Sequence, residues 1–328
     1  MMYDWKDLLD KINREIADMS YERKPEELYA PIKYVLSLGG KRVRPVLMLL
    51  AYNMYKEDVE RIYPQAMAIE IYHNYTLLHD DLMDRADMRR GKLTVHKKWN
   101  DNAAILSGDS MLVMAYEYML KNCPDGKTDK VMSLFTQTAL EIGEGQQYDI
   151  EFETRNDVSE EEYIEMIRLK TSVLLACALK IGAILGGASD ADAEKLYSFG
   201  ENLGLAFQLQ DDYLDVYGDP AVFGKKIGGD ILCNKKTYML INALRLADSE
   251  DRCQLEGWIA KSEGTYDPAE KIAAVTALYN KIGIRHLCDE KIRFYFEKAS
   301  HILNELALSD ERKQPLWEMA HALLDRKS

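Results

Sequence analysis

The chain has 328 residues, of which 47% are hydrophobic and 30% charged, and its formal net charge at pH 7 is −13. This composition is typical of a globular protein and excludes an intrinsically disordered one. The acidic balance argues against nucleic acid or an anionic membrane as partner, because both would repel such a surface. Apolar runs such as Val46–Ala51 are too short to cross a bilayer, so we expect no stable membrane insertion.

The N-terminus and the cysteines indicate the compartment. Met1–Asp10 contains three aspartates and lacks the apolar centre of a secretory signal. The cysteines are odd in number, scattered and without a CxxC pair, which argues against a disulfide framework or a zinc site. They are Cys123, Cys177, Cys233, Cys253 and Cys288. We therefore expect a cytoplasmic protein.

Helical periodicity begins at the N-terminus. Apolar residues recur at three- and four-residue steps from Trp5 to Met19, and again from Leu28 to Leu36 after Pro25, which is placed at a helix start. Gly39-Gly40 is expected to stop the second helix. Pro45 is then expected to open an apolar helix from Val46 to about Tyr55.

The helical pattern continues to the other end of the chain. One apolar helix is expected to end in Asp80–Asp84 and another in Asp211–Asp215. Ser159 and Glu162 form a capping-box pattern ahead of a helix over Tyr163–Ala188. Leu316–Leu323 repeats the helical period, and we find no alternating strand pattern and no linker. The sequence therefore predicts an all-α protein, a single-domain helical bundle over residues 1–328 with a central active-site cavity.

The two aspartate clusters carry the clearest chemical signal. Asp80 and Asp84 lie four residues apart, as do Asp211 and Asp215, so each pair projects from one helix face and repels within it. A divalent cation reverses this repulsion, and Mg²⁺ is usually held by one or two carboxylates together with substrate phosphates. The alternative is a solvated acidic face. Apolar helix reaches up to both clusters, which favours a cavity wall and a magnesium site.

Basic residues oppose these aspartates. Gly39–Pro45 places three cations in a turn before a helix start, where an anion can bind, although ordinary surface turns also look like this. Arg89 and Arg90 follow the first cluster closely enough to reach a diphosphate, or else form a solvated helix end. Lys225 and Lys226 lie in a Gly-rich loop after the second cluster that can close over phosphates, or is simply exposed.

Other candidates have no distinctive pattern. Lys170, Thr171 and Gln146 lie within expected helices, and His73 is a lone histidine without a zinc partner at the right spacing. Taken together, the acidic and basic clusters suit the binding of two anionic groups. Cations keep the two groups apart, and metal ions bind one of them. This arrangement predicts a site for two diphosphate substrates.

At these residues the sequence resembles the trans-prenyl diphosphate synthase family, of the short-chain type. Gly39–Pro45 matches its GGKRxRP segment, and the match runs from about residue 25 to 240. The other matching segments, in family order, are Glu70–Asp81, Arg89-Arg90-Gly91, Gly145–Asp149, Lys170-Thr171, Phe207-Gln208, Asp211–Asp215 and the Gly-Lys loop over Gly224–Asp230. The C-terminal third carries no motif of this kind.

The resemblance implies a role for each matching residue. Asp80, Asp84 and Asp211 would bind three magnesium ions around the allylic diphosphate, supported by Asp81 and Asp215. The allylic diphosphate would be contacted by Arg89, Lys170, Gln208, one of Lys225 and Lys226, and Lys235 nearby. The diphosphate of isopentenyl diphosphate would be held by Lys41, Arg44, His73 and Arg90. Thr171 and Gln208 would stabilise a carbocation formed when the allylic C–O bond ionises.

Tyr75 and Tyr72 lie five and eight residues before Asp80, so both can face one apolar tunnel. In the family, a bulky residue at the fifth position before the first aspartate of the motif goes with C15 to C20 products. The first motif lacks the two-residue insertion of typical bacterial farnesyl synthases, which leaves farnesyl and geranylgeranyl diphosphate both open. Ordinary helix packing of the tyrosines is the alternative.

Two other functions compete with this interpretation. A class I terpene cyclase shares the helices and DDxxD, but Asp211–Asp215 does not fit its second metal motif and Gly39–Pro45 would be unexplained. A non-catalytic helical subunit should have lost aspartates or substrate cations, and all are present. The family is usually homodimeric, which we therefore expect here.

Overall fold

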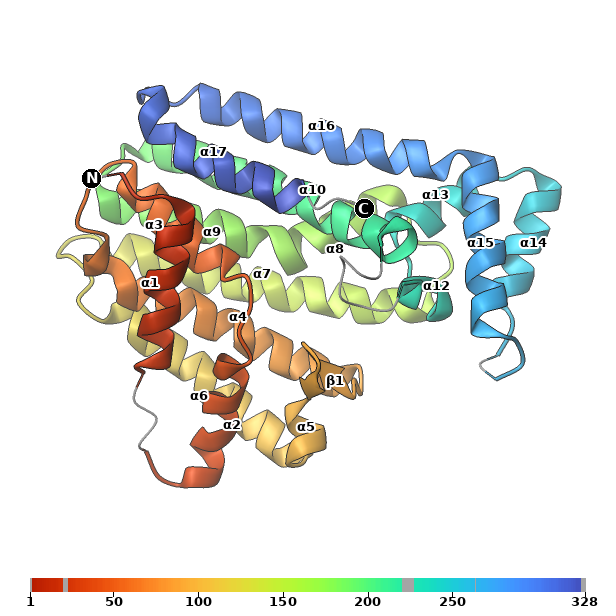
Figure 1. Cartoon of the computed structure of the whole chain (residues 1–328), viewed down its shortest axis with the longest axis horizontal. Coiled ribbons are helices and arrows are strands. Elements are labelled where there is room, and N and C mark those ends of the chain that lie inside the picture. The colour runs from red at the N-terminus through yellow and green to blue at the C-terminus, as the bar shows by residue number, and fades with distance from the viewer. Residues whose placement is uncertain (1, 20–22, 220–226, 263, 326–328) are drawn as a thin grey trace. The chain divides into compact units, whose positions relative to one another are not determined.

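Helix dominates the computed structural model of the chain, which describes residues 2–19, 23–219, 227–262 and 264–325 (Figure 1). The elements are α1 (Trp5–Ala17), α2 (Glu26–Ser37), α3 (Val43–Asn53), the 3-10 turn η1 (Val59–Ile62), α4 (Tyr63–Met83), β1 (Met88–Arg89), β2 (Lys92–Leu93), α5 (Val95–Lys98), α6 (Asp101–Leu120), α7 (Thr128–Thr154), α8 (Glu160–Ile167), the π-helical turn η2 (Arg168–Ser172), α9 (Val173–Gly186), α10 (Asp190–Tyr217), α12 (Gly229–Leu232), α13 (Tyr238–Leu246), α14 (Ser249–Ile259), α15 (Pro268–Ile282), α16 (Ile284–Asn304) and α17 (Asp310–Leu324). The all-α prediction is confirmed.

The contacts within the chain group into two compact units. Unit 1 comprises Met1–Thr136, Cys177–Tyr197 and Ala307–Glu318, and unit 2 comprises Gln137–Ala176, Ser198–Leu306 and Met319–Ser328. Four of the five unit boundaries fall inside a helix, namely α7, α9, α10 and α17. The single domain over residues 1–328 stays a prediction.

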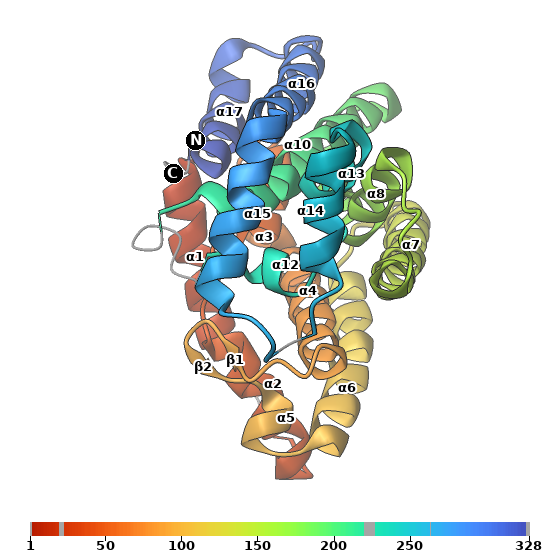
Figure 2. The ribbon, with the colours of Figure 1, turned by 90° about the vertical axis from the view of Figure 1, so that its right-hand side faces the viewer.

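In unit 1, helix α4 packs most extensively against α6 and also contacts α3 and α2. Figures 1 and 2 both show α4 and α6 side by side. Helix α3 is buried along nearly its whole length, as expected for a helix that is apolar on all sides. Helix α1 buries one stripe, Leu8, Ile12 and Ile16, at the predicted four-residue spacing. These packed helices fix the C-terminal end of α4, where the first aspartate cluster lies.

The turn between α2 and α3 is close to its prediction. Pro25 is the residue before α2, and the helix ends at Ser37, ahead of two glycines with φ of +76° and +139°. Helix α3 begins at Val43, two residues before Pro45, so the predicted start was late. Proline is tolerated in a first helical turn because the N–H it lacks would have no helical partner there.

A short hairpin follows α4 and was not predicted. Met88 pairs with Leu93 and Arg89 with Lys92, and the two residues between them, Arg90 and Gly91, both have positive φ, at 52° and 73°. Positive φ at both positions is typical of the tight turns that join two antiparallel strands. Figure 2 shows this hairpin near α2 and α5.

Unit 2 contains a second core, formed by α8, α10, α13, α15 and α16. Helices α14 and α15 lie side by side in Figures 1 and 2 and contact each other. The capping box of Ser159 and Glu162 is confirmed, with both reciprocal hydrogen bonds present. The helix predicted over Tyr163–Ala188 is present as one helical stretch, Glu160–Gly186, with the π-helical turn η2 inside it. Turn η2 separates α8 from α9, and there the Val173 N–H donates to the Arg168 carbonyl five residues earlier.

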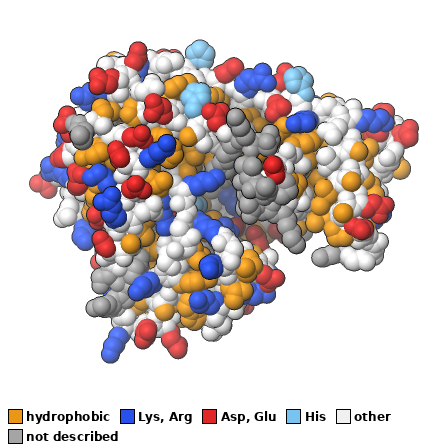
Figure 3. Space-filling view, viewed as in Figure 1, with side chains coloured by type: hydrophobic (Ala, Val, Ile, Leu, Met, Phe, Trp, Pro, Cys, Tyr) orange, Lys and Arg blue, Asp and Glu red, His pale blue; other side chains and the backbone are white. Residues whose placement is uncertain are grey.

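The surface and the helices bear on the membrane prediction. On the face shown in Figure 3, Asp and Glu side chains are scattered among Lys and Arg. Among the described residues, one helical stretch, Glu160–Gly186, is long and apolar enough to cross a bilayer by length and composition. Its most apolar window is 78% buried inside the protein, which is also the property of a core helix, so it is weak evidence for a membrane span.

Candidate active site

The first aspartate cluster lies at the C-terminal end of α4. Asp80 and Asp81 belong to its last turn and Asp84 is its C-cap. Arg89, on β1, donates from Nε to both Asp81 carboxylate oxygens at 2.8 Å, and its Nη2 lies 3.7 Å from Asp80 Oδ2. Carboxylates at a helix C-terminus face the negative end of the helix dipole. Arg89 therefore offsets part of this unfavourable charge.

Asp81 is the most buried of the three, with 8% of its side chain exposed. Burial raises its pKa, while the hydrogen bond and charge of Arg89 act in the opposite direction. The net shift of the Asp81 pKa is upward. Asp80 is more accessible, with 19% of its side chain exposed. Asp80 is thus better placed than Asp81 to meet a cation from solvent.

A cluster of cations lies in the same unit, where the turn after α2 meets α4 and the hairpin. Arg44 Nη1 lies 3.2 Å from His73 Nε2, and an Arg90 guanidinium nitrogen donates to the Gly39 carbonyl. A Cβ on Gly40 would lie 2.9 Å from the end of the flexible Arg90 side chain, and the φ of +139° at Gly40 itself favours glycine. The structure therefore brings together three of the four residues expected to hold isopentenyl diphosphate, while Lys41 is exposed beside them.

The electrostatics of this cluster favour an anion. Burial, followed by the charges of Arg44 and Arg90, lowers the pKa of His73 well below its ordinary value, so the ring is neutral at pH 7. Burial also lowers the pKa of Arg44, to about 10. Among the described residues, the buried Arg44 Nε has no hydrogen-bond partner. The missing acceptor is one that a bound diphosphate oxygen could supply.

Arg42, the middle cation of the predicted turn, is buried and stabilises the fold. Its Nη1 lies 2.6 Å from Glu70 Oε1, and both side chains are 3% exposed. Its Nη2 donates to the Leu36 carbonyl at 2.8 Å. Spacing in the sequence does not separate this arginine from its neighbours, because all three follow the same two glycines.

Tyr72 and Tyr75 form an aromatic cluster with residues of other helices. Their ring centroids are 5.4 Å apart, which confirms that the two lie on one face of α4. Tyr72 also contacts Phe135 at 5.3 Å, and Tyr75 contacts His79 at 4.9 Å. Tyr116 adds a further ring 5.0 Å from Phe135. No local sequence pattern points to Phe135 or Tyr116, because contacts between helices decide their place.

In unit 2, the second aspartate cluster continues a hydrogen-bonded chain that starts at η2. Thr171 Oγ1 donates to Gln208 Oε1 at 3.0 Å, and Gln208 Nε2 donates to Asp212 Oδ1 at 2.9 Å. The Tyr163 hydroxyl donates to the other Asp212 oxygen. Asp212 is 4% exposed, and burial raises its pKa to about 6. The sequence analysis predicted Asp211 and Asp215 as site residues. It did not predict that Asp212 links the cluster to Thr171 through Gln208.

Lys170 lies beside this chain and is paired. Its Nζ is 2.6 Å from Asp149 Oδ2, on α7. Burial raises the pKa of Asp149, but the charges of Lys170 and Lys235 outweigh it and the pKa falls below its ordinary value. Asp149 was quoted for the family resemblance but not as a site residue. Its role becomes visible only when α7 and η2 are placed together.

The segment after α10 closes back on Asp215. The Asp230 N–H donates to Asp215 Oδ2 at 2.9 Å, and the Lys235 N–H donates to the Asp230 carbonyl at 2.9 Å. Burial raises the pKa of Asp230 to about 7. Asp230 was not among the predicted site residues. Lys225 and Lys226 lie outside the described residues.

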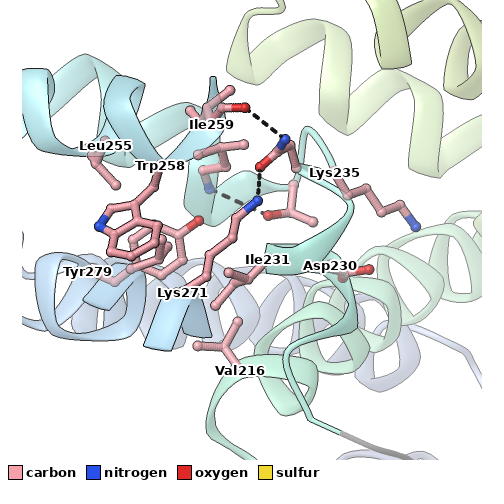
Figure 4. A pocket seen from close by; sticks show the side chains of 13 residues that line it. Val216, Asp230, Ile231, Lys235, Leu255, Trp258, Ile259, Lys271 and Tyr279 are labelled. Atoms are coloured by element: carbon pink, nitrogen blue, oxygen red, sulfur yellow. Dashed lines mark hydrogen bonds between the residues drawn. The ribbon is translucent and has the colours of Figure 1, made fainter. Parts of the chain in front are cut away.

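Lys271 supports this segment from α15. It is 1% exposed, and its Nζ donates to Asn234 Oδ1 at 2.7 Å and to the Leu232 carbonyl at 3.3 Å. Figure 4 shows it beside Trp258 and Tyr279, while Lys235 extends in another direction. Lys271 therefore anchors α12, and the Lys235 side chain that follows α12 in the sequence is exposed.

Within the described part of the chain, no three His, Cys, Asp or Glu side chains are grouped closely enough to hold a metal ion by themselves. Asp80, Asp81 and Asp84 belong to unit 1, whereas Asp211 and Asp215 belong to unit 2. The structure brings residues together within each cluster. A joint metal site of the two clusters stays a prediction.

The model of the family Polyprenyl synthetase matches residues 25–278. The chain belongs to this family. A geranylgeranyl diphosphate synthase of Methanosarcina mazei is 44% identical over 318 residues, covering 96% of this chain and 95% of that protein. The crystal structure of a geranylgeranyl pyrophosphate synthase is 43% identical and covers 100% of both chains with a TM-score of 0.94. A geranylgeranyl pyrophosphate synthase of Corynebacterium glutamicum, solved with isoprenyl diphosphate and magnesium, is 27% identical with a TM-score of 0.83, covering 98% of this chain and 96% of that one.

These findings confirm the predicted family, fold class and type of reaction. This polyprenyl synthetase is a short-chain trans-prenyltransferase, which condenses isopentenyl diphosphate with an allylic diphosphate. The similarity extends over nearly the whole chain, including the C-terminal third in which the sequence showed no motif. The terpene cyclase and the non-catalytic subunit are therefore not the favoured interpretations.

Proposed function

We propose that this prenyltransferase makes geranylgeranyl diphosphate (C20) as its main product, with farnesyl diphosphate (C15) as the alternative. The aromatic cluster below Asp80 carries the proposal. Tyr75 lies about 7.5 Å and Tyr72 about 12 Å along α4 from Asp80, at 1.5 Å per residue. Tyr72 is 2% exposed and backed by Phe135, which makes it the firmer barrier to a growing chain. The product named for the 44% identical relative supports the same length.

The donor atoms of both clusters suit magnesium. Asp80, Asp84 and Asp211 offer carboxylate oxygen alone, the ligand type that this cation prefers, with Asp81 and Asp215 in support. The magnesium in the Corynebacterium structure supports this assignment. When bound, magnesium neutralises charge that develops on the departing diphosphate. We propose three ions for each site.

The protein's own groups bind and orient the two substrates. Arg44, His73 and Arg90, with Lys41 beside them, hold the diphosphate of isopentenyl diphosphate. Arg89, Lys170 and Lys235 bind the allylic diphosphate, and their charges favour its departure with the electron pair of the C–O bond.

The hydroxyl oxygen of Thr171 and the amide oxygen of Gln208 stabilise the carbocation that remains. The alkene of isopentenyl diphosphate then forms the new C–C bond with this carbocation. The released diphosphate removes the proton, so the reaction needs no protein nucleophile. This agrees with the absence of a Ser-His-Asp or Cys-His signature in the sequence.

Product analysis tests this function. The enzyme is incubated with radiolabelled isopentenyl diphosphate and each allylic starter, with and without magnesium, and the products are sized by chromatography. We expect a C20 product that requires magnesium and both substrates. A C15 product would overturn the chain length alone. Cyclic hydrocarbon from an allylic diphosphate alone would favour the cyclase, and no diphosphate release from any pair would favour the non-catalytic subunit.

We further propose a cytoplasmic homodimer, in which residues 1–328 act as one domain. Homodimers are typical of the family, and the free, scattered cysteines without a CxxC pair suit a reducing compartment. Light scattering after size-exclusion chromatography should give twice the 37.7 kDa of one chain. A mass of one chain at micromolar concentration would contradict the dimer without affecting the proposed chemistry.

A further inference from the structure

Turn η2, which carries Lys170 and Thr171, is held between two glycines on neighbouring helices. Gly145 lies on α7 and Gly204 on α10, and both are buried. A Cβ on Gly145 would lie 2.8 Å from the Leu169 carbonyl carbon and closer still to the Lys170 nitrogen. A Cβ on Gly204 would lie 2.6 Å from Ser172 Cα and 2.7 Å from Ser172 Cβ. Carbon atoms in contact are normally 3.5–4.0 Å apart, so neither position has room for a side chain.

Each helix makes a second, polar contact with the same turn one helical turn later. Asp149 follows Gly145 by four residues and pairs with Lys170 at 2.6 Å. Gln208 follows Gly204 by four residues and accepts from Thr171 at 3.0 Å. Residues four apart lie on one helix face, so on each helix the glycine and the polar residue face η2 together. On each helix the glycine sets how closely η2 packs. The polar side chain then contacts a residue of η2, which is Lys170 for Asp149 and Thr171 for Gln208.

Two exposed glycines of the unit lack this property. Gly143 lies two residues before Gly145 on the same helix, is exposed, and has no atom within 4 Å of an added Cβ. Gly257 on α14 is likewise exposed and open. Glycine inside a helix has a stability cost relative to alanine, because it loses more backbone freedom on folding. At Gly145 and Gly204 the close approach of the backbones requires a glycine in spite of this cost. At Gly143 and Gly257 the packing would also accept an alanine.

We propose that Gly145 and Gly204 are positioning residues for prenyl transfer, because they set the depth of η2 and thereby aim the Lys170 ammonium and the Thr171 hydroxyl. This inference rests on the proposed roles of Lys170 and Thr171. A side chain at either glycine pushes against backbone atoms, which cannot rotate away. Turn η2 must then shift, and a misplacement of about 1 Å near reacting groups can cost about 100-fold in rate.

The test compares Gly145→Ala and Gly204→Ala with Gly143→Ala and Gly257→Ala in the full-length enzyme. We expect kcat to fall about 10- to 100-fold in the first pair. KM for isopentenyl diphosphate should stay within about twofold, since its predicted ligands belong to other elements of the chain than η2. The two control variants should keep wild-type kcat and KM, with an equal or higher melting temperature. Wild-type kcat in either buried variant, or an equal loss in the controls, would overturn the proposal.

A double-mutant cycle separates positioning from general destabilisation. Thr171→Ala combined with Gly204→Ala should lose less kcat than the product of the two single losses, because the hydroxyl that Gly204 helps to aim is already missing, while the effect on Lys170 remains. Multiplied losses would contradict the proposal. If the wild-type enzyme transfers prenyl groups and Thr171→Ala is equally active, the role of Thr171 fails. An inactive wild-type enzyme would instead refute the proposed function.

An exchange variant covers the case in which Gly204→Ala does not fold. Gly204→Ala with Ser172→Gly removes the Ser172 Cβ and Oγ from the contact and leaves only the 2.6 Å approach of the added Cβ to the Cα of residue 172. This variant should fold and recover part of kcat relative to Gly204→Ala. A folding failure that the exchange does not relieve would assign Gly204 to folding alone and end its positioning role.

Discussion

The buried ion pair of Arg42 and Glu70 should support both the stability of unit 1 and the turn expected to bind isopentenyl diphosphate. Both side chains are 3% exposed and 2.6 Å apart. Arg42 is also bonded to the Leu36 carbonyl, and Glu70 Oε1 accepts from Asn74 Nδ2 at 2.9 Å. Replacing Glu70 with Leu keeps a side chain of similar size and leaves the guanidinium buried without its carboxylate.

The expected cost follows from this burial. Removing one partner of a buried ion pair destabilises a protein by about 3–5 kcal/mol, because the remaining charge is uncompensated. An exposed pair contributes about 0–1 kcal/mol. Lys11 and Glu60 form such a pair at 3.3 Å, with 30% and 52% of their side chains exposed. Lys11→Met is therefore the matched control.

Urea denaturation followed by circular dichroism measures both variants against the wild type. Glu70→Leu should lower the free energy of unfolding by about 3–5 kcal/mol and Lys11→Met by less than about 1 kcal/mol. Below the unfolding transition, KM for isopentenyl diphosphate should rise in Glu70→Leu, since Arg42 no longer fixes the turn that leads into α3 and Arg44. A destabilisation of Glu70→Leu below about 1 kcal/mol would refute the argument from burial.

Three further predictions concern the site. Tyr75→Ala should lengthen the product, while Tyr75→Phe, which keeps the ring, should not; an unchanged product after Tyr75→Ala, seen by chromatography, would refute the barrier. His73 should remain neutral at pH 7 in the free enzyme, since burial and its arginine neighbours lower its pKa. A bound diphosphate adds negative charge and should raise that pKa, which NMR titration can follow, and a further fall would contradict it. Asp80→Asn should reduce kcat at least about 100-fold and raise the magnesium concentration needed for half-maximal activity; wild-type magnesium dependence would remove Asp80 from the metal site.

Local sequence signals predicted the helices and the placement of the aspartates well. The capping box of Ser159 and Glu162 and the apolar stripe of α1 depend on contacts within one or two turns, which sequence spacing records directly. The aspartates at the end of α4 were placed for the same reason. The start of α3 predicted from Pro45 was two residues late, because proline is compatible with several positions in a first helical turn.

Features set by contacts between helices could not be predicted. Turn η2 has no distinctive sequence, and its depth depends on two glycines more than 20 residues before and after it. Asp212 and Asp230 look like ordinary acidic residues until burial and neighbouring groups are known. His73 has no local pattern either; the family resemblance placed it, and the structure shows it beside Arg44.

The predicted substrate cations fall into two electrostatic classes. Arg89 and Lys170, expected to bind the allylic diphosphate, are already paired with Asp81 and Asp149 at 2.8 Å and 2.6 Å. Among the described residues, Arg44 has no carboxylate within ion-pair distance, and burial lowers its pKa. An incoming diphosphate can therefore bind at Arg44 without displacing a carboxylate. At Arg89 it competes with Asp81 unless a metal cation takes over that carboxylate charge, so metal dependence should be concentrated on the allylic side.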